Sequence, residues 1–228
     1  MAGEWLKRKI NNTQKKFTGI PYELRRWYNK KRIKSRDFTI ISNNCWAGKV
    51  YQYFDMPYLS PTVGLYFFAE DYLKFISDLH YYFSLELNFI SADKSKYRDI
   101  LIQRKHTNVP IAHLGDIEII FLHYHSEEEV QEKWERRKKR VNYDNIFIKF
   151  SKMNLCTEDD IEKFSVLPFQ NKFVLNTCKK TKYSCEYYWS GRSNDLEILS
   201  DTNPFPGNLS LSQLLSKKSE HYPDSGLC

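Results

Sequence analysis

The chain alternates short apolar runs with amphipathic stretches, and this pattern predicts its main elements. Continuous apolar runs predict buried strands at residues 38–41, 117–124, 146–150 and 173–175. Between them, apolar residues recur at helical spacing over 65–83 and over 126–141. Alternating strands and helices predict an α/β fold with a largely parallel sheet and helices on both faces, in a Rossmann-like three-layer arrangement.

Local signals add detail to this pattern. Ser126 with Glu129, and Thr157 with Asp160, are capping-box patterns that begin helices. Weaker patterns predict a strand at 85–90, a short helix within 94–106 and an edge strand at 183–189. Because both faces of 117–124 are apolar, we expect this strand near the centre of the parallel sheet.

Charge divides the chain unevenly. Residues 1–37 hold twelve Lys or Arg against three acids, whereas the whole chain has a net charge of +7, so the remainder is slightly acidic. We predict a basic N-terminal helical arm at 1–37, an α/β domain at 38–190 and a C-terminal extension at 191–228. A nucleic-acid-binding fold carries its basic surface on the fold itself, so we expect no nucleic-acid partner.

The arm places Trp and Leu among its basic clusters, and Gly19-Ile20-Pro21 predicts a break into two helices. Aromatic residues beside Lys and Arg suit an anionic membrane surface. The alternative is an arm that packs back on the domain with its charges solvated. The candidate membrane-binding residues are Trp5, Lys7, Arg8, Arg25, Arg26, Trp27, Lys30, Lys31 and Arg32.

The five cysteines form no CxxC pair, which is typical of free thiols in a reducing compartment. The chain has neither a hydrophobic signal core at its start nor an apolar run long enough to span a membrane. We expect a cytoplasmic protein, peripheral on the inner face of the cytoplasmic membrane if the arm binds lipid.

The loop Ser42–Gly48, with sequence SNNCWAG, holds the most suggestive chemistry. It offers a thiol, two amides and an indole beyond the carboxyl end of a strand, where ligands bind in open α/β sheets. The helix that follows offers free N–H groups to an anion. The alternative is a capped turn with a buried cysteine and a packed tryptophan.

If the four buried strands are parallel, their carboxyl ends bring His123 and His125 to this loop. A cysteine beside a histidine is the minimal unit for an activated thiol, and an asparagine amide can donate to an oxyanion. This combination favours acyl transfer. The candidate catalytic residues are Cys45, His123, His125 and Asn44, and the candidate substrate-binding residues are Asn43, Trp46, Ser42, Arg137, Ser151 and Asn176.

Simpler readings stay open for several of these residues. His123 and His125 would share one face of a strand, a spacing that can bind metal, but packing or a loop hydrogen bond is the commoner use, and we expect no metal site. Asp116 and Glu118 begin a strand, so we read them as structural. Arg137 lies within the apolar stripe of its helix and needs a partner, either an anionic ligand or one of these two acids; we favour the internal salt bridge.

Four linked segments carry a family resemblance: NNCWAG (43–48), SPTVGLYFFAEDYLKF (60–75), residues 113–150 and CTEDDIEKFSVLPFQNK (156–172). Together they resemble a bacterial family labelled exopolysaccharide biosynthesis protein, domain of unknown function nineteen-nineteen, over roughly residues 38–178. The resemblance implies an α/β fold and a role in capsule, lipopolysaccharide or exopolysaccharide assembly, without a defined reaction. The Asn44-Cys45 pair is also similar to a pair that some capsule acyltransferases place after their first strand.

We therefore predict a transferase that acts on a sugar or lipid-linked saccharide precursor of a cell-surface polysaccharide. The favoured reaction is acyl transfer to a sugar hydroxyl, with acyl-coenzyme A as donor and no covalently bound cofactor. One alternative is a glycosyl- or phospho-sugar transferase with a nucleotide-activated donor. Another is a non-catalytic, membrane-associated partner of polysaccharide assembly. The sequence has no Gly-rich phosphate loop, GxSxG elbow or HExxH motif.

Overall fold

A computed structural model describes residues 22–33, 35–194 and 196–201. The chain divides into two compact units, one formed by residues 1–36 and 206–228 and the other by residues 37–205. In the first unit, α2 (Tyr22–Arg32) is the helix expected after Pro21. The helix expected before Gly19 lies outside the described residues.

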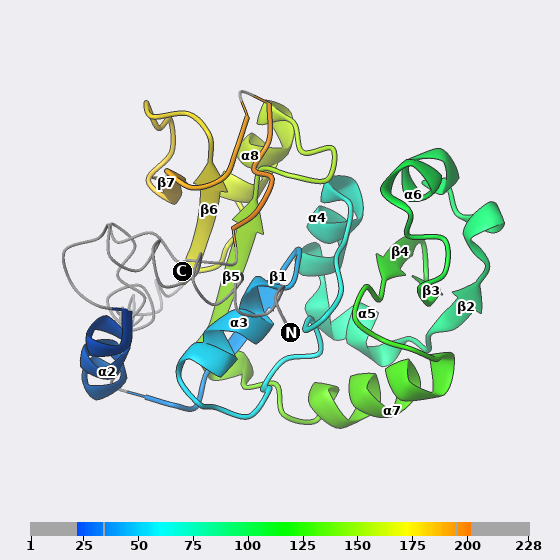
Figure 1. The fold of residues 1–228 in the computed structure, drawn as a ribbon, viewed down its shortest axis with the longest axis horizontal. Coiled ribbons are helices and arrows are strands. Elements are labelled where there is room, and N and C mark those ends of the chain that lie inside the picture. Colours follow the sequence, from blue (N-terminus) through cyan, green and yellow to red (C-terminus); the bar gives the residue numbers. More distant parts are fainter. Residues whose placement is uncertain (1–21, 34, 195, 202–228) are drawn as a thin grey trace, which may run out of the picture. The chain divides into compact units, whose positions relative to one another are not determined.

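The larger unit is built on a parallel sheet, which confirms the predicted fold class (Figure 1). Its four strands lie in the order β1-β5-β6-β7, and each neighbouring pair is parallel. The strands are β1 (Thr39–Ser42), β5 (Ile146–Ser151), β6 (Lys172–Asn176) and β7 (Glu186–Tyr188).

Helices cover both faces of this sheet. On one face lies α3 (Trp46–Tyr53), whose Trp46 meets Phe173 of β6 edge-on with ring centroids 5.4 Å apart. On the other face lie α4 (Ala69–Ser77) and α8 (Glu158–Ser165). Phe150 of β5 contacts Tyr72 of α4 and Phe164 of α8, with ring centroids about 5.5 Å apart in each pair. The two faces of the parallel sheet therefore contact different helices.

The segment 117–124 does not join the parallel sheet, and that prediction was wrong. Its strand, β4 (Ile117–Ile120), belongs to a three-stranded antiparallel sheet with β2 (Asn88–Ile90) and β3 (Ile111–Leu114). Both faces of β4 are apolar because they meet two different clusters: Ile119 packs in the main core, and Ile120 packs in a smaller cluster with Leu101. Burial on two faces therefore did not require parallel neighbours.

The antiparallel sheet turns at Gly115, which links β3 to β4 with φ +65°. A Cβ there would lie 2.8 Å from Leu85 Cδ1, so both conformation and space favour glycine. Beyond Ile120 the chain leaves the strand. His123 and His125 consequently lie in the connection to α7 (Glu127–Lys138), not on a strand face as predicted.

The predicted helix over 65–83 is interrupted. Tyr66 forms a β-bridge with Ile120, so helix α4 begins only at Ala69. Helix α4 ends before Asp78, whose side chain accepts from the Tyr81 N–H and caps the next helix, α5 (Leu79–Ser84). The other helical elements among the described residues are η2 (Ala92–Lys94), α6 (Arg98–Arg104) and η3 (Tyr143–Asn145). Among the described residues, no helix is long and apolar enough to cross a membrane.

Candidate functional site

The loop after β1 folds back to cap the start of α3. The Ser42 hydroxyl donates to the Asn44 carbonyl at 2.7 Å and accepts from the Ala47 N–H at 3.3 Å. The Asn44 side-chain oxygen accepts from the Trp46 N–H at 3.1 Å. Two of the N–H groups that we expected to be free for an anion are therefore already bonded within the loop.

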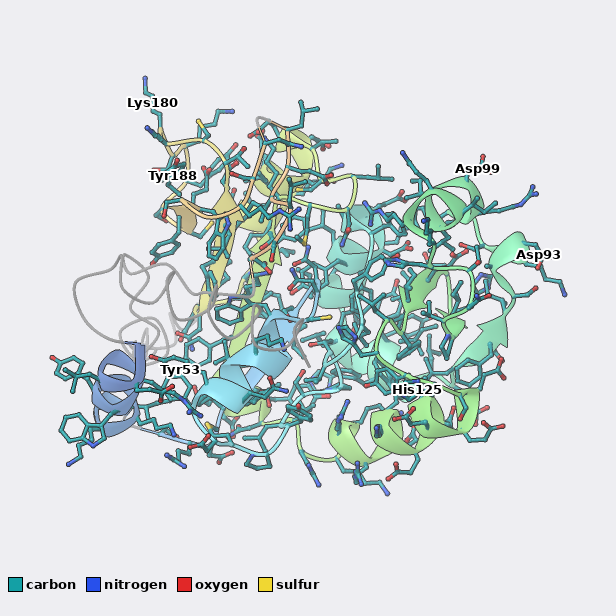
Figure 2. The ribbon with its side chains drawn as sticks, viewed as in Figure 1. Tyr53, Asp93, Asp99, His125, Lys180 and Tyr188 are labelled. Atoms are coloured by element: carbon teal, nitrogen blue, oxygen red, sulfur yellow. The ribbon has the colours of Figure 1, made fainter. Side chains whose placement is uncertain are left out.

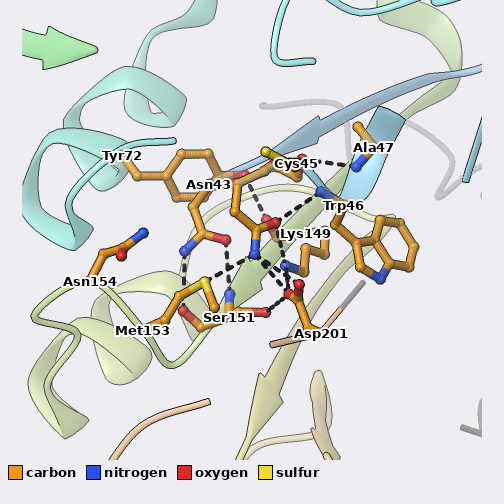
Figure 3. Close-up of polar contacts among 12 residues, drawn as sticks. Asn43, Cys45, Trp46, Ala47, Tyr72, Lys149, Ser151, Met153, Asn154 and Asp201 are labelled. Atoms are coloured by element: carbon orange, nitrogen blue, oxygen red, sulfur yellow. Dashed lines mark hydrogen bonds and ion pairs between the residues drawn. The ribbon is translucent and has the colours of Figure 1, made fainter. Parts of the chain in front are cut away.

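Four buried polar side chains form what we call the sealed cluster: Asn44, Lys149, Ser151 and Asp201 (Figure 3). The Asp201 carboxylate pairs with the Lys149 ammonium and accepts from Asn44 Nδ2 at 2.9 Å and from Ser151 Oγ at 2.6 Å. Lys149 Nζ also donates to Asn44 Oδ1 at 3.0 Å. Each side chain is at most 7% exposed, so the two charges are compensated internally.

Asp201 remains ionised in this setting. Burial alone would raise the pKa of its carboxyl, but the Lys149 charge and the hydrogen bonds from Lys149, Ser151 and Asn44 outweigh burial, and the pKa is lowered. Burial lowers the pKa of Lys149. The sealed cluster thus joins Asp201 to the loop that carries Cys45.

The side-chain amides of Asn43 and Asn44, predicted to donate to an oxyanion, are hydrogen-bonded to other residues of the protein. Asn43 exchanges two 3.1 Å hydrogen bonds with the Ser151 main chain, and Asn44 Nδ2 is bonded to Asp201. An oxyanion would have to displace one of these partners. Among the other predicted substrate-binding residues, Trp46 is fully buried, and Asn176 donates to Glu186 at 2.7 Å.

An open pocket of about 320 Å³ lies beside α3. We call it the basic pocket, because its lining holds the basic side chains of Lys49, His123, Lys133 and Arg137, together with the Cys45 thiol. Its other lining residues are Gly48, Gln52, Tyr58, Val63, Gly64 and Tyr124. No carboxylate is among the lining residues, although Lys133 pairs with Glu129 beyond them.

Arg137 is the buried cation of this pocket, at 6% exposure. Its guanidinium donates to the Val63 carbonyl and the Tyr124 hydroxyl, and it lies 4.9 Å from the centre of the Tyr58 ring. Within the described part of the chain, no carboxylate lies within 4 Å of it.

The favoured salt bridge from Arg137 to Asp116 or Glu118 was therefore wrong. Asp116 pairs with Lys74 at 3.2 Å, and Glu118 accepts from Ser95 and lies 3.2 Å from His113. Asp116 lies in the β3–β4 turn and Glu118 lies on β4, and neither pairs with Arg137. Among the residues that the structure describes, the buried Arg137 charge has neutral partners only, which is the arrangement an anionic ligand would complete.

Cys45 lies in the wall of the basic pocket, but its thiol is not activated there. Burial and the nearby Asp201 carboxylate raise its pKa to about 11, so the thiol stays protonated at neutral pH. Its Sγ donates to the Leu65 carbonyl at 3.6 Å. No histidine of the described chain hydrogen-bonds to it.

The two candidate histidines face different cavities. His123 is an exposed residue that lines the basic pocket, where partial burial and the nearby Lys49 charge lower its pKa below the ordinary value, which favours the neutral imidazole at pH 7. His125 is exposed beside the start of α7 (Figure 2), where its backbone N–H donates to the Glu129 carboxylate, and it lines a second pocket. Among the described residues, no three His, Cys, Asp or Glu are grouped closely enough to hold a metal ion.

Two glycines keep the basic pocket open. A Cβ at Gly48 would lie 2.9 Å from Val63 Cγ1. Gly64 has φ +80°, and a Cβ there would lie 3.1 Å from the Tyr124 ring. Sequence reasoning had not named Lys49, Tyr58, Tyr124, Lys133, Lys149 or Asp201. The one available signal was Lys149, a charge inside an otherwise apolar strand.

Of the candidate membrane-binding residues, Arg26, Trp27, Lys30 and Lys31 lie on α2. Trp27 is 54% exposed, with the Lys31 ammonium 4.5 Å from its ring centre. Trp5, Lys7 and Arg8 lie outside the described residues, as do the side chains of Arg25 and Arg32.

Fold and site together define an α/β protein with a basic, ligand-sized pocket beside the loop that follows its first strand. Residues 20–211 match a family model described as Domain of unknown function (DUF1919), and the chain belongs to this family. It is also similar to a Haemophilus influenzae protein named "Uncharacterized protein", 32% identical over 162 residues, or 71% of this chain and 72% of that protein. The family match is wider than the expected 38–178 and includes Asp201.

Proposed function

We propose that this protein is a transferase that modifies a precursor of a cell-surface polysaccharide, and that its basic pocket binds the phosphate-bearing end of the donor. The observation that carries the proposal is Arg137, a buried guanidinium whose partners among the described residues are all neutral, in a pocket with no carboxylate among its lining residues. Guanidinium groups bind phosphates through paired hydrogen bonds. The pocket volume is at the low end for small-molecule sites, so it suits part of a donor rather than a whole nucleotide.

The favoured reaction is direct acyl transfer from acyl-coenzyme A, with His123 as general base. The sugar hydroxyl gives its proton to the imidazole while its oxygen bonds to the thioester carbonyl carbon. The C–S bond then breaks with its electron pair on sulfur, and the imidazolium returns the proton to that sulfur. A neutral imidazole at pH 7 suits this role, whereas a thiol with a pKa of about 11 does not suit a covalent relay through Cys45.

The biological setting is supported by the resemblance to exopolysaccharide biosynthesis proteins. We place the protein in the cytoplasm, where acyl-coenzyme A is available, and peripherally on the inner face of the membrane. The exposed Leu24, Trp27 and Tyr28 of α2, interspersed with basic residues, support attachment to an anionic surface. They also favour the alternative of a non-catalytic partner that docks at the membrane.

A nucleotide-sugar donor is the other candidate, because its diphosphate would meet the same cations. Thermal-shift and calorimetric titrations with acetyl-coenzyme A, UDP-glucose and UDP-N-acetylglucosamine separate the candidates. We expect acetyl-coenzyme A to raise the melting temperature. Arg137→Gln should sharply reduce the shift, because the affinity falls about tenfold or more. Arg136→Gln, a change of the neighbouring exposed arginine that pairs with Glu132, should preserve it.

Failure of every phosphate-bearing ligand to bind would overturn the proposal, as would equal effects of the two arginine variants. Once an acceptor is in hand, His123→Gln should lower turnover about 100-fold or more. Cys45→Ala should retain most of the activity. Full loss in Cys45→Ala with native folding would restore the covalent route.

A further inference from the structure

A second pocket, of about 580 Å³, lies on the part of the molecule that holds the antiparallel sheet. We call it the outer pocket. It is formed by residues 90–93 with η2, by α6 through Arg98 and Ile102, by the segment 107–110 before β3, and by residues 125–127 at the start of α7. Figure 2 labels Asp93 and His125 on two of these walls.

The outer pocket differs from the basic pocket in its charge. Its charged side chains are the carboxylates of Asp93 and Glu127 and the guanidinium of Arg98, and the His125 imidazole lies among them. Within the described chain, the side chains of Thr107, Asn108 and Glu127 make no hydrogen bond or ion pair. The pocket therefore offers both donors and acceptors, without the excess of positive charge that would select a phosphate.

Apolar surface lies among these polar groups. Ile102 is 51% exposed and faces the pocket together with Val109 and Pro110. A neutral sugar presents hydroxyl groups at its edge, which both donate and accept, and C–H groups on its ring faces. The outer pocket matches both parts, and its volume lies within the range of small-molecule sites.

One short segment separates the two pockets. His123 lines the basic pocket and His125 the outer pocket, and two residues of chain span at most about 7 Å. Tyr124 between them is buried and fixed, because its hydroxyl donates to the Val63 carbonyl at 2.6 Å and accepts from Arg137. Group transfer needs donor and acceptor held on either side of one catalytic group.

We infer that the outer pocket binds the acceptor saccharide, with His125 as a positioning residue and His123 facing the donor. This inference rests on the proposed transferase function. It assigns the two histidines separate tasks: His125 holds a sugar hydroxyl, and His123 removes its proton.

The test is saturation-transfer NMR on the full chain, without donor, using disaccharides built from glucose, galactose, N-acetylglucosamine and rhamnose. We expect at least one disaccharide to bind. Asn108→Ala and Ile102→Ala should each weaken binding about fivefold or more, the value of one hydrogen bond or one apolar contact. Gln103→Ala, on the same helix but outside the outer pocket, should not. All three residues are largely exposed, so the variants should fold, which melting curves check.

Absence of saccharide binding, or wild-type affinity in the Asn108→Ala/Ile102→Ala double variant, would overturn the inference. Arg137→Gln separates it from the proposed function. That variant should lose acetyl-coenzyme A binding and keep saccharide binding. A protein that binds the donor but no disaccharide contradicts the outer-pocket assignment alone.

Discussion

The loop Ser42–Trp46 contributes to both the sealed cluster and the basic pocket, and the two treat a buried cation differently. In the sealed cluster, Lys149 is paired with Asp201, and the surrounding amide and hydroxyl complete the hydrogen bonds. In the basic pocket, the partners of Arg137 among the described residues are a carbonyl, a hydroxyl and aromatic rings. The first arrangement is complete without a ligand and the second is not. We expect the sealed cluster to govern stability and the basic pocket to govern binding.

The largest expected effect is that of Asp201→Ala. It leaves the Lys149 ammonium buried without a counter-charge, which should lower the free energy of unfolding by about 3–5 kcal/mol in urea titrations. Asp159→Ala, which breaks the exposed pair with Lys163, serves as the control and should leave the transition midpoint unchanged. A small effect of Asp201→Ala would show that the cluster is not a structural tie.

The pH dependence has a definite sign. Because the pKa of Asp201 is lowered in the folded state, its stabilising contribution is present above the unfolded pKa of about 3.9 and is lost as pH falls through the folded value. The wild type and Asp201→Ala should therefore approach one another in stability only in acid.

Arg137→Gln should have a large effect on ligand affinity and a small effect on the free energy of unfolding. The affinity for a phosphate-bearing ligand should fall about tenfold or more. The free energy of unfolding should fall by only about 1–2 kcal/mol, because the Val63 carbonyl and the Tyr124 hydroxyl each lose one neutral hydrogen-bond contact to the guanidinium. Calorimetry and urea titration of the same sample give both values. If this variant were as unstable as Asp201→Ala, Arg137 would be a structural residue.

Cys45 tests whether the cluster and the pocket are coupled. With a pKa of about 11, roughly one thiol in a thousand is ionised at pH 8, so iodoacetamide should modify Cys45 far more slowly than free cysteine. Asp201→Asn removes a charge that raises this pKa and should speed modification. Peptide mass spectrometry separates Cys45 from the exposed Cys178. Rapid modification of the wild type at pH 7.5 would contradict a protonated thiol.

The smallest expected effect concerns His123. Burial and Lys49 place the midpoint of its NMR titration below the ordinary value of about 6.5. Lys49→Gln should move the midpoint partway back, because burial, the larger cause, remains. The signal is assigned by its loss in His123→Gln. A midpoint above 7 would remove His123 as a neutral base.

The sequence predicted the elements whose signals are local. The parallel strands β1, β5 and β6 fall within two residues of their predicted bounds, and the Thr157–Asp160 capping box is present in full. The membership of β4 could not be read in this way, since two hydrophobic clusters bury a strand as well as two parallel neighbours do. A usable signal was missed at Gly115-Asp116, a two-residue hairpin pair that predicts the antiparallel β3–β4 turn.

The sequence predicted that Cys45 and His123 belong to one site, but it did not predict the residues that surround them. Cys45 and His123 do line one pocket, although the reason given for their proximity, a shared sheet edge, was wrong. Asp201 could not be found, because nothing local in the sequence ties it to Lys149 across the fold. The basic character of the pocket likewise depends on side chains from α3 and α7 that only the tertiary fold brings together.

The pairing of β1 with β5 has a consequence for how the molecule folds. These neighbours are joined by the whole of residues 43–145, whereas β5 and β6 are joined by α8 and its short connections. Closing so long a loop costs entropy that must be met before the new contacts form. We therefore expect β1 to dock late in refolding. The loop that carries Cys45 directly follows β1, so ligand binding should return only after most of the circular-dichroism signal has recovered.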